Sequence, residues 1–243
     1  MPYDLRRLGL TDTLRCGAEL RNRGNAARSV EEGAQAMAQF LYQELVDGRT
    51  GERACALVRC YATHAYESLP AELRGLARKS FGRKSIPADL RCLVLLGTAG
   101  DRPEWNDRRQ SVAHQVIPLG AVDAIERSPM VAQMIRSFGI ELSDLVALGD
   151  RPLRVPEGKT AGLFHVSQAE GSPFLDQDFV AEQRIESVLG FGGPVRSGEL
   201  LAMLLFSRTG IGDDTATRFR TMALDMRAGL FAAGDLPTFR RET

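Results

Sequence analysis

Residues 184–208 have the sequence RIESVLGFGGPVRSGELLAMLLFSR. Two apolar runs, residues 187–190 and 200–206, flank a segment rich in glycine, proline and serine. Short β-prone runs separated by such residues are typical of an antiparallel hairpin. The second run is apolar on both faces, so we expect a central strand covered on both sides. Residues 190–193 (GFGG) are assigned to the hairpin connection, because they lack the Lys-Ser/Thr ending of a phosphate loop.

The spacing of the apolar residues changes after this hairpin. Between residues 210 and 231 they recur at intervals of three and four, which is the spacing of one helix face. These residues are Phe219, Met222, Ala223, Met226 and Leu230. Asp213, Asp214 and Thr215 lie where an N-cap and first-turn acids belong. We therefore expect the order strand, hairpin, strand, helix.

This ending resembles that of GAF domains, a family of bacterial signalling and sensor proteins. The similar features are Ile185-Glu186-Ser187-Val188-Leu189, a hairpin, Gly198-Glu199-Leu200-Leu201-Ala202, an apolar strand and a C-terminal helix. The clearest match covers residues 160–232, and a weaker one covers residues 29–119. The resemblance implies an α+β fold with an antiparallel GAF/PAS-like sheet flanked by helices. It also implies a sensory function, since the family usually signals to an attached kinase, cyclase or DNA-binding domain.

The composition narrows the possible partners. Of 243 residues, 44% are hydrophobic, and 31 Lys and Arg balance 31 Asp and Glu. A zero net charge gives no global field to attract nucleic acid or an anionic membrane. The N-terminus lacks the apolar core of a signal peptide. No run approaches the roughly 20 apolar residues of a membrane helix. We expect a cytoplasmic protein that binds neither nucleic acid nor membrane.

Further elements precede the hairpin. Ser29 and Glu32 form a capping box, and the helix after it should stop near Gly48. Strands are expected at residues 54–62, 90–96, 114–119 and 162–166, with a helix at 70–82. In the first of these strands the even-numbered residues should share one face. Pro118 restricts the third to a sheet edge. Residues 169–178 are expected to be a loop.

These elements suggest one domain with additions. Residues 1–28 are polar and Arg-rich with a weak helical pattern, so we expect an N-terminal arm, either a helix on a partner subunit or a loose tail. Residues 29–233 form the GAF-like domain. Within it, residues 120–160 resemble the family least and are expected to be a helical insertion that covers one face of the sheet. Residues 234–243 form a tail.

The loop at residues 104–109 holds the only tryptophan of the chain. Trp105 offers a stacking face, and Arg108 and Arg109 offer planar donors suited to carboxylate or phosphate. With Asn106, they are candidates for binding an anionic or aromatic small molecule. In the alternative interpretation, Trp105 packs over the sheet edge and the arginines pair with acids of the same loop.

Four more residues are candidates for the same ligand site. His114 precedes the predicted edge strand and could donate to a ligand or bind a haem iron, whereas the alternative is a surface histidine. His165 lies between two apolar residues of a predicted strand, where it could equally be a core histidine. Ser172 and Phe174 could close the opposite side, or form a plain turn. The ligand and cofactor stay open; haem is possible but not preferred.

Neither the cysteines nor the acids indicate catalysis. Cys16, Cys55, Cys60 and Cys92 form no CxxC pair and no zinc-ligand spacing, so no metal site is predicted. We expect buried free thiols. One enzymatic GAF branch reduces methionine sulfoxide through cysteines, and its cysteine pattern is not recognised here. No spacing singles out an acid/base pair.

We therefore expect a non-catalytic, small-molecule-sensing regulatory domain that acts on a signalling partner through a homodimer. The dimer is suggested by Met222 and Met226 on the last helix and by the amphipathic helix at residues 29–47, although both could be core faces. One alternative is a thiol-dependent redox enzyme that uses Cys60 or Cys92. Another is a ligand-free interaction module, in which side chains fill the space under the insertion. Those side chains would be Phe138, Leu142, Phe164 and Phe174.

Overall fold

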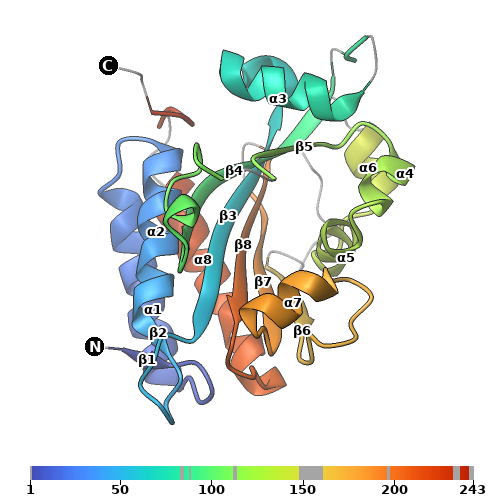
Figure 1. Ribbon diagram of the computed structural model, residues 1–243. Helices are drawn as coiled ribbons and strands as arrows, with labels where there is room; N and C mark the ends of the chain where they lie inside the picture. Colours follow the sequence, from blue (N-terminus) through green and yellow to red (C-terminus); the bar gives the residue numbers. More distant parts are fainter. Residues whose placement is uncertain are drawn as a thin grey trace.

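Six antiparallel strands form the central sheet of the computed structural model, which describes residues 2–82, 85–87, 89–111, 114–147, 161–195, 198–231 and 236–240. From edge to edge the order is β5-β4-β3-β8-β7-β6. The strands are β3 (Cys55–Ala65), β4 (Arg91–Gly100), β5 (Val116–Pro118), β6 (Gly162–Val166), β7 (Ser187–Pro194) and β8 (Leu200–Ser207). Helices lie on both faces (Figure 1). The predicted α+β fold with an antiparallel sheet flanked by helices is confirmed.

The hairpin predicted from the sequence is formed by β7 and β8, which pair with Pro194 opposite Leu200. β8 lies between β3 and β7, and its alternate side chains enter the cores on opposite faces. It is therefore the central, doubly covered strand that was predicted. Residues 190–193, which the sequence assigns to the connection, belong to β7 instead. A Cβ atom on Gly192 would lie 2.0 Å from the carbonyl oxygen of Leu201, so this glycine allows the strand to continue.

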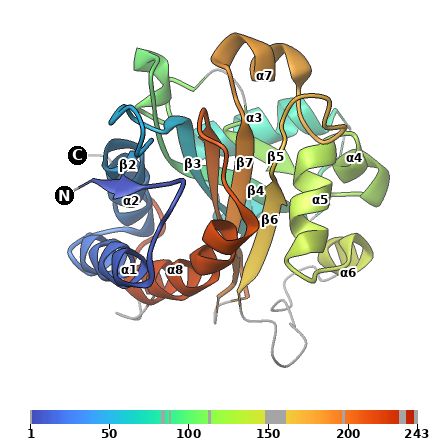
Figure 2. The ribbon, with the colours of Figure 1, turned by 90° about the horizontal axis from the view of Figure 1, so that it is seen from below.

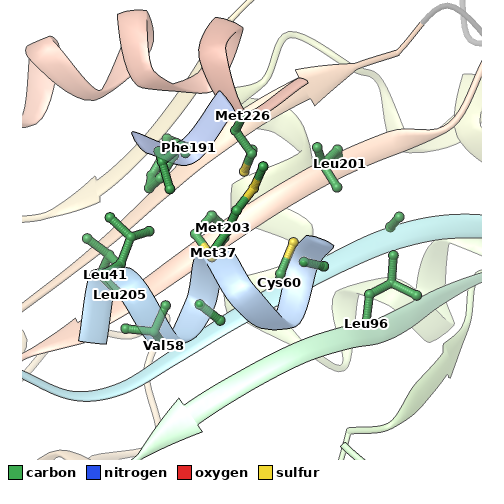
Figure 3. Packing of buried hydrophobic residues seen from close by; sticks show 14 of the residues in the cluster. Met37, Leu41, Val58, Cys60, Leu96, Phe191, Leu201, Met203, Leu205 and Met226 are labelled. Atoms are coloured by element: carbon green, nitrogen blue, oxygen red, sulfur yellow. The ribbon is translucent and has the colours of Figure 1, made fainter. Parts of the chain in front are cut away.

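One face of the sheet is covered by the longest helices of the described chain. These are α1 (Leu10–Asn25), α2 (Val30–Glu44) and α8 (Asp213–Phe231), with α3 (Ala71–Phe81) beside β5 at the sheet edge. Figure 3 shows the core that they form with the strands, in which Met37 of α2 and Met226 of α8 meet Met203 of β8. Met222 and Met226 are fully buried in this core. The helix faces that suggested a dimer are therefore core faces.

The N-terminal segment belongs to this layer. Cys16 and Leu20 of α1 are fully buried, and α1 runs beside α8 (Figure 2). A Cβ atom on Gly24 would lie 2.4 Å from the backbone of Gly229, so the two glycines let the helices pack closely. Residues 1–28 were expected to form an arm, either a helix on a partner subunit or a loose tail; in the structure, the buried face of α1 lies against the last helix of its own chain.

Both ends of α2 differ from a free helix. At its start, Ser29 accepts a hydrogen bond from the amide of Glu32 at 3.1 Å, as the capping box predicts. The carbonyl oxygens of Pro237 and Thr238 accept the amides of Val30 and Glu31, at 3.0 and 2.9 Å. The described part of the expected tail, residues 236–240, therefore caps this helix. At its end, α2 stops before Gly48 because β2 (Leu45–Val46) pairs with β1 (Tyr3–Asp4).

The second face of the sheet is covered by shorter helices. They are α4 (Val122–Glu126), α5 (Pro129–Ser137), α6 (Leu142–Ala147) and α7 (Gln177–Gln183). The first three lie within residues 120–160, for which a helical insertion was predicted, and they pack over this face; residues 148–160 lie outside the described residues. α7 was not predicted, and it includes Gln177 and Asp178 of the expected loop. Asp176 caps it by accepting the amides of Asp178 and Phe179.

Two strands depart from the predicted pattern. The register of β3 shifts between Cys55 and Leu57, so Ala56 faces the α5 side and not the side of Val58 and Cys60. β4 continues through Gly97, the glycine that was expected to end it. Gly97 instead makes room for α2, because a Cβ atom there would lie 2.5 Å from the helix backbone. β5 lies at the sheet edge, as Pro118 predicts. None of the described helices is both long and apolar enough to span a membrane.

Candidate functional site

A cavity of about 420 Å³ lies between the second face of the sheet and the helices α5 and α7. Its floor comes from β3, β4, β7 and β8, and its walls come from α5, α7 and the segments beside β5. Most lining side chains are apolar. The apolar lining residues are Leu57, Leu93, Trp105, Ile117, Pro129, Met130, Val131, Met134, Leu175, Phe179, Val180, Val188, Leu204 and Phe206. The others are Arg59, Tyr61, His114, Arg127, Ser128 and Asp176.

The alternation of β3 determines which residues reach the cavity. After the register shift, Leu57, Arg59 and Tyr61 face the cavity, whereas Val58 and Cys60 face the core under α2. Arg59 lies opposite Thr98 of β4 and Leu204 of β8, near the middle of the sheet. Apart from the hydroxyl of Tyr61, the cationic side chain of Arg59 therefore stands on an apolar floor.

One wall is aromatic. The rings of Trp105 and Phe179 are 6.0 Å apart, and those of Phe179 and Phe206 are 5.5 Å apart in an edge-to-face arrangement. Such geometries are favourable for aromatic pairs. The guanidinium of Arg102 lies 4.9 Å from the centre of the Trp105 ring and forms an ion pair with Glu182 of α7. These contacts hold α7 against the end of β4.

Arg59 is bonded to neutral hydroxyl groups. Its Nη1 donates to the hydroxyl of Tyr61 at 3.3 Å, and its Nη2 donates to Oγ of Ser111 at 3.0 Å. Its Nε is shielded from solvent and has no acceptor among the described residues. Burial raises the pKa of the Tyr61 phenol, while Arg59 opposes that shift. Tyr61 therefore stays protonated at neutral pH and keeps a proton to donate.

His114 lies at the rim of the cavity, where it is exposed. Its φ of 65° is in the left-handed region, which only a few per cent of non-glycine residues adopt. Partial desolvation lowers the pKa of His114, Arg59 lowers it further, and Asp176 opposes the shift. His114 is therefore uncharged at neutral pH.

The candidates at residues 105–109 do not converge on one site. Trp105 lines the cavity. Asn106 stabilises its own loop, because Oδ1 accepts the amide of Gly100 at 3.2 Å and Nδ2 donates to the carbonyls of Gly100 and Arg102 at 2.9 Å. Arg108 pairs with Glu31 of α2 on the other side of β4, and so not with the acids of its own loop. Arg109 is exposed and is not among the lining residues.

The remaining candidates lie away from the cavity lining. His165 shares the α8 side of β6; its Nε2 lies 3.0 Å from the carbonyl oxygen of Ile211 and its Nδ1 lies 3.2 Å from Asp213. His114 and His165 therefore do not share one site. Ser172 accepts the amide of Phe174 in a turn, and Phe174 packs half-buried against the core under the insertion. Within the described residues, no three His, Cys, Asp or Glu side chains gather as metal ligands would.

The four cysteines are fully buried, free and outside the cavity lining. They belong to the core on the α2 side of the sheet. Burial raises the pKa of each thiol to about 12. The reactive form of cysteine is the thiolate, and the raised pKa disfavours that form at neutral pH.

The cavity contains residues that sequence reasoning did not single out. Arg59 and Tyr61 form its polar floor, and Phe179 forms part of its wall. A signal for Arg59 was present, since it is the one charged residue in the run CALVRCYA at residues 55–62. A charge inside an apolar strand needs a partner or a polar cavity.

The strand order and the helices on both faces form a GAF-like fold. No protein-family model matches the sequence, and no curated protein does either. Among solved structures, this chain is similar to the GAF domain of a phosphoenolpyruvate-protein phosphotransferase from Coxiella burnetii. The TM-score is 0.50 and the sequence identity is 11%, over 92% of this chain and 95% of that chain. This likeness shows a shared fold, and it supports the resemblance seen in residues 184–208.

Proposed function

We propose that this protein is a small-molecule-sensing regulatory domain, and that the cavity between the sheet and helices α5 and α7 binds the ligand. The observation that carries the proposal is the cavity itself. Its volume of about 420 Å³ lies within the range of roughly 300–1,000 Å³ typical of ligand pockets. Its lining is mostly apolar with a few convergent polar groups, which is the usual composition of such sites.

The walls support a regulatory role. α5 and α7 lie outside the sheet and each contributes side chains to the cavity, so a bound molecule would contact two helices and the sheet together. Binding would then favour one arrangement of α7 and β3. A ligand shifts a conformational equilibrium through such differential contacts. The output would reach a partner protein through the helices on the other face.

A ligand-free interaction module receives partial support from the packing under the insertion. Phe138, Leu142 and Phe164 are buried there, and Phe174 is half-buried, as that hypothesis requires. The cavity nevertheless remains beside them. A redox enzyme receives less support, because Cys60 and Cys92 lie on the other face with raised pKa values.

Self-association is a separate part of the proposal. The faces that motivated it are buried within the chain, whereas Leu10 and Leu14 on the outer side of α1 are 65% and 56% exposed. Light scattering over a concentration series measures the oligomeric state. A monomeric mass throughout would remove the dimer and leave the ligand site unaffected.

The cavity can be tested with N-phenyl-1-naphthylamine, a neutral apolar probe that brightens in apolar surroundings and accepts energy from tryptophan. Trp105 is the only tryptophan of the chain and lines the cavity, so bound probe should quench it. Val131→Phe, on the α5 wall, should weaken binding several-fold, because the added ring fills the cavity. Val122→Phe, in α4 and outside the lining, is the matched control. Absence of probe binding, or equal binding by both variants, would overturn the proposal.

A further inference from the structure

The position of Arg59 is unusual for a charged residue. It lies within β3 on the cavity floor, between Leu57 and Tyr61 on the same face and opposite Leu204 of β8. The surrounding lining is mostly apolar. Removing a charge from water is unfavourable unless an opposite charge or several hydrogen bonds compensate for it.

The compensation at Arg59 is incomplete. Two nitrogens donate to neutral hydroxyls, of Tyr61 and Ser111, and the third has no acceptor in the described part of the chain. No described carboxylate lies within ion-pair distance of this guanidinium. The Tyr61 hydroxyl accepts from Arg59, which leaves its own proton to be donated elsewhere. The Nε of Arg59 and the hydroxyl of Tyr61 can thus both donate hydrogen bonds to an acceptor atom of a ligand.

The other charged groups of the lining lie at the rim. Arg127 is 73% exposed at its side chain and pairs with Asp123, at 3.6 Å. Asp176 is exposed and accepts the first amides of α7. His114 is uncharged at neutral pH, because desolvation and Arg59 lower its pKa. Arg59 is therefore the cation inside the described cavity.

A single inner cation selects for a single negative charge. A phosphate monoester carries about −1.5 to −2 charges at neutral pH. It would bring excess negative charge into apolar surroundings. A carboxylate carries one charge and matches the planar fork of an arginine. The rings of Trp105 and Phe179 on the wall, with Phe206 beside them on the floor, offer aromatic surface to the rest of such a molecule.

We infer that the cavity binds a monocarboxylate with an apolar or aromatic body. Its carboxylate accepts hydrogen bonds from Arg59 and Tyr61, and its body lies against Trp105 and Phe179. This inference rests on the proposed function, because it assigns the chemical class of ligand to the same cavity.

The test compares two molecules of the same shape and different charge. 2-Naphthoate and 2-naphthalenemethanol each compete with N-phenyl-1-naphthylamine, and each is followed by probe fluorescence and by Trp105 emission. We expect the carboxylate to bind roughly tenfold to hundredfold more tightly than the alcohol, as is typical of charge-assisted hydrogen bonds. Equal affinities with intact binding would overturn this inference alone. Failure of all three molecules to bind would overturn the proposed function as well.

Substitutions test whether Arg59 causes the preference for the carboxylate over the alcohol. Arg59→Gln should remove the preference for the carboxylate while the affinity for the alcohol is retained, and Arg59→Lys should keep part of it. Arg109→Gln removes an exposed cation that does not line the cavity and should change nothing, so it is the matched control. If Arg59→Gln fails to fold by circular dichroism, Tyr61→Phe, which removes only a hydroxyl, should reduce the preference several-fold. An undiminished preference for the carboxylate in Arg59→Gln, or in Tyr61→Phe where that variant is used instead, would overturn the assignment.

Discussion

Arg108 and Glu31 form a buried ion pair, in which Nε of the arginine donates to Oε1 of the glutamate at 2.7 Å. Their side chains are only 4% and 8% exposed. The second carboxylate oxygen of Glu31 accepts the amide of Arg240, and the Arg108 guanidinium lies 5.8 Å from the centre of the Phe239 ring. The pair thus joins the loop after β4, the first turn of α2 and the C-terminal segment.

Arg108→Ala should therefore destabilise the fold. Removing one partner leaves a buried charge without compensation, which costs about 3–5 kcal/mol. Arg109→Ala changes an exposed neighbour, and its effect should stay within about 0.5 kcal/mol. Urea denaturation measures both. Similar unfolding midpoints for the two variants would contradict this assignment of Arg108 to the structure.

The close approach of α2 to the sheet can be tested at Gly97. An added Cβ atom would lie 2.5 Å from the backbone of Ala34, so Gly97→Ala must displace the helix and should cost about 1–3 kcal/mol. Gly75 is exposed within α3, and a Cβ atom there would meet nothing within 4 Å. Gly75→Ala should stabilise by about 0.5–1 kcal/mol. In thermal denaturation, the midpoint should fall for Gly97→Ala and rise for Gly75→Ala. Shifts in the same direction would contradict the close packing of α2 on Gly97.

His64 should make the fold sensitive to mild acid. Burial lowers its pKa from 6.5 to about 4; Glu199 opposes this shift and Arg91 adds to it. As the pH falls through 6.5, the unfolded chain binds a proton that the folded chain does not, so stability decreases until about pH 4. The loss corresponds to about 3 kcal/mol.

His64→Leu should flatten this part of the stability profile, measured by urea denaturation between pH 7 and 4.5. Asp47 loses its stabilising effect mainly below this range, because its pKa is 3.8 in the unfolded chain and hydrogen bonds from Arg6 and the Arg49 amide lower it to about 2 in the fold. An unchanged slope in the variant would assign the acid sensitivity to other groups.

The cysteines should be unreactive in the folded protein. Each thiol is fully buried, and burial raises its pKa to about 12. We expect no labelling by a thiol reagent at neutral pH until guanidinium unfolds the chain, after which all four cysteines react. Rapid labelling of Cys60 or Cys92 without denaturant would revive the thiol-dependent enzyme.

Much of the sheet could be predicted because its signals are local. Continuous apolar runs identified β4 and β8, Pro118 placed β5 at an edge, and the capping box placed the start of α2. The glycines of β7 were assigned to a turn because sequence alone does not show which residue faces them. Gly192 is needed because the backbone of Leu201 on the neighbouring strand leaves no room for a Cβ atom. Such a contact between strands is not visible in the sequence.

The candidate site was harder to predict, because adjacent residues of a loop can face opposite sides of a sheet. Trp105 and Arg108 are three positions apart, yet one lines the cavity and the other pairs with α2. Arg59 lies far from that loop in the sequence, and only the fold brings it into the same cavity as Trp105 and Phe179. α7 was missed because its seven residues follow a segment of turn formers.

The thickness of one sheet separates the cavity from the helices of the other face. Arg59 points into the cavity, and its chain neighbours Val58 and Cys60 point into the core with Met37 and Leu41 of α2 (Figure 3). These side chains share one stretch of backbone, so β3 cannot move on one side without moving on the other. A small displacement of β3 at Arg59 would therefore reach α2 directly, without a hinge or a long relay of side chains.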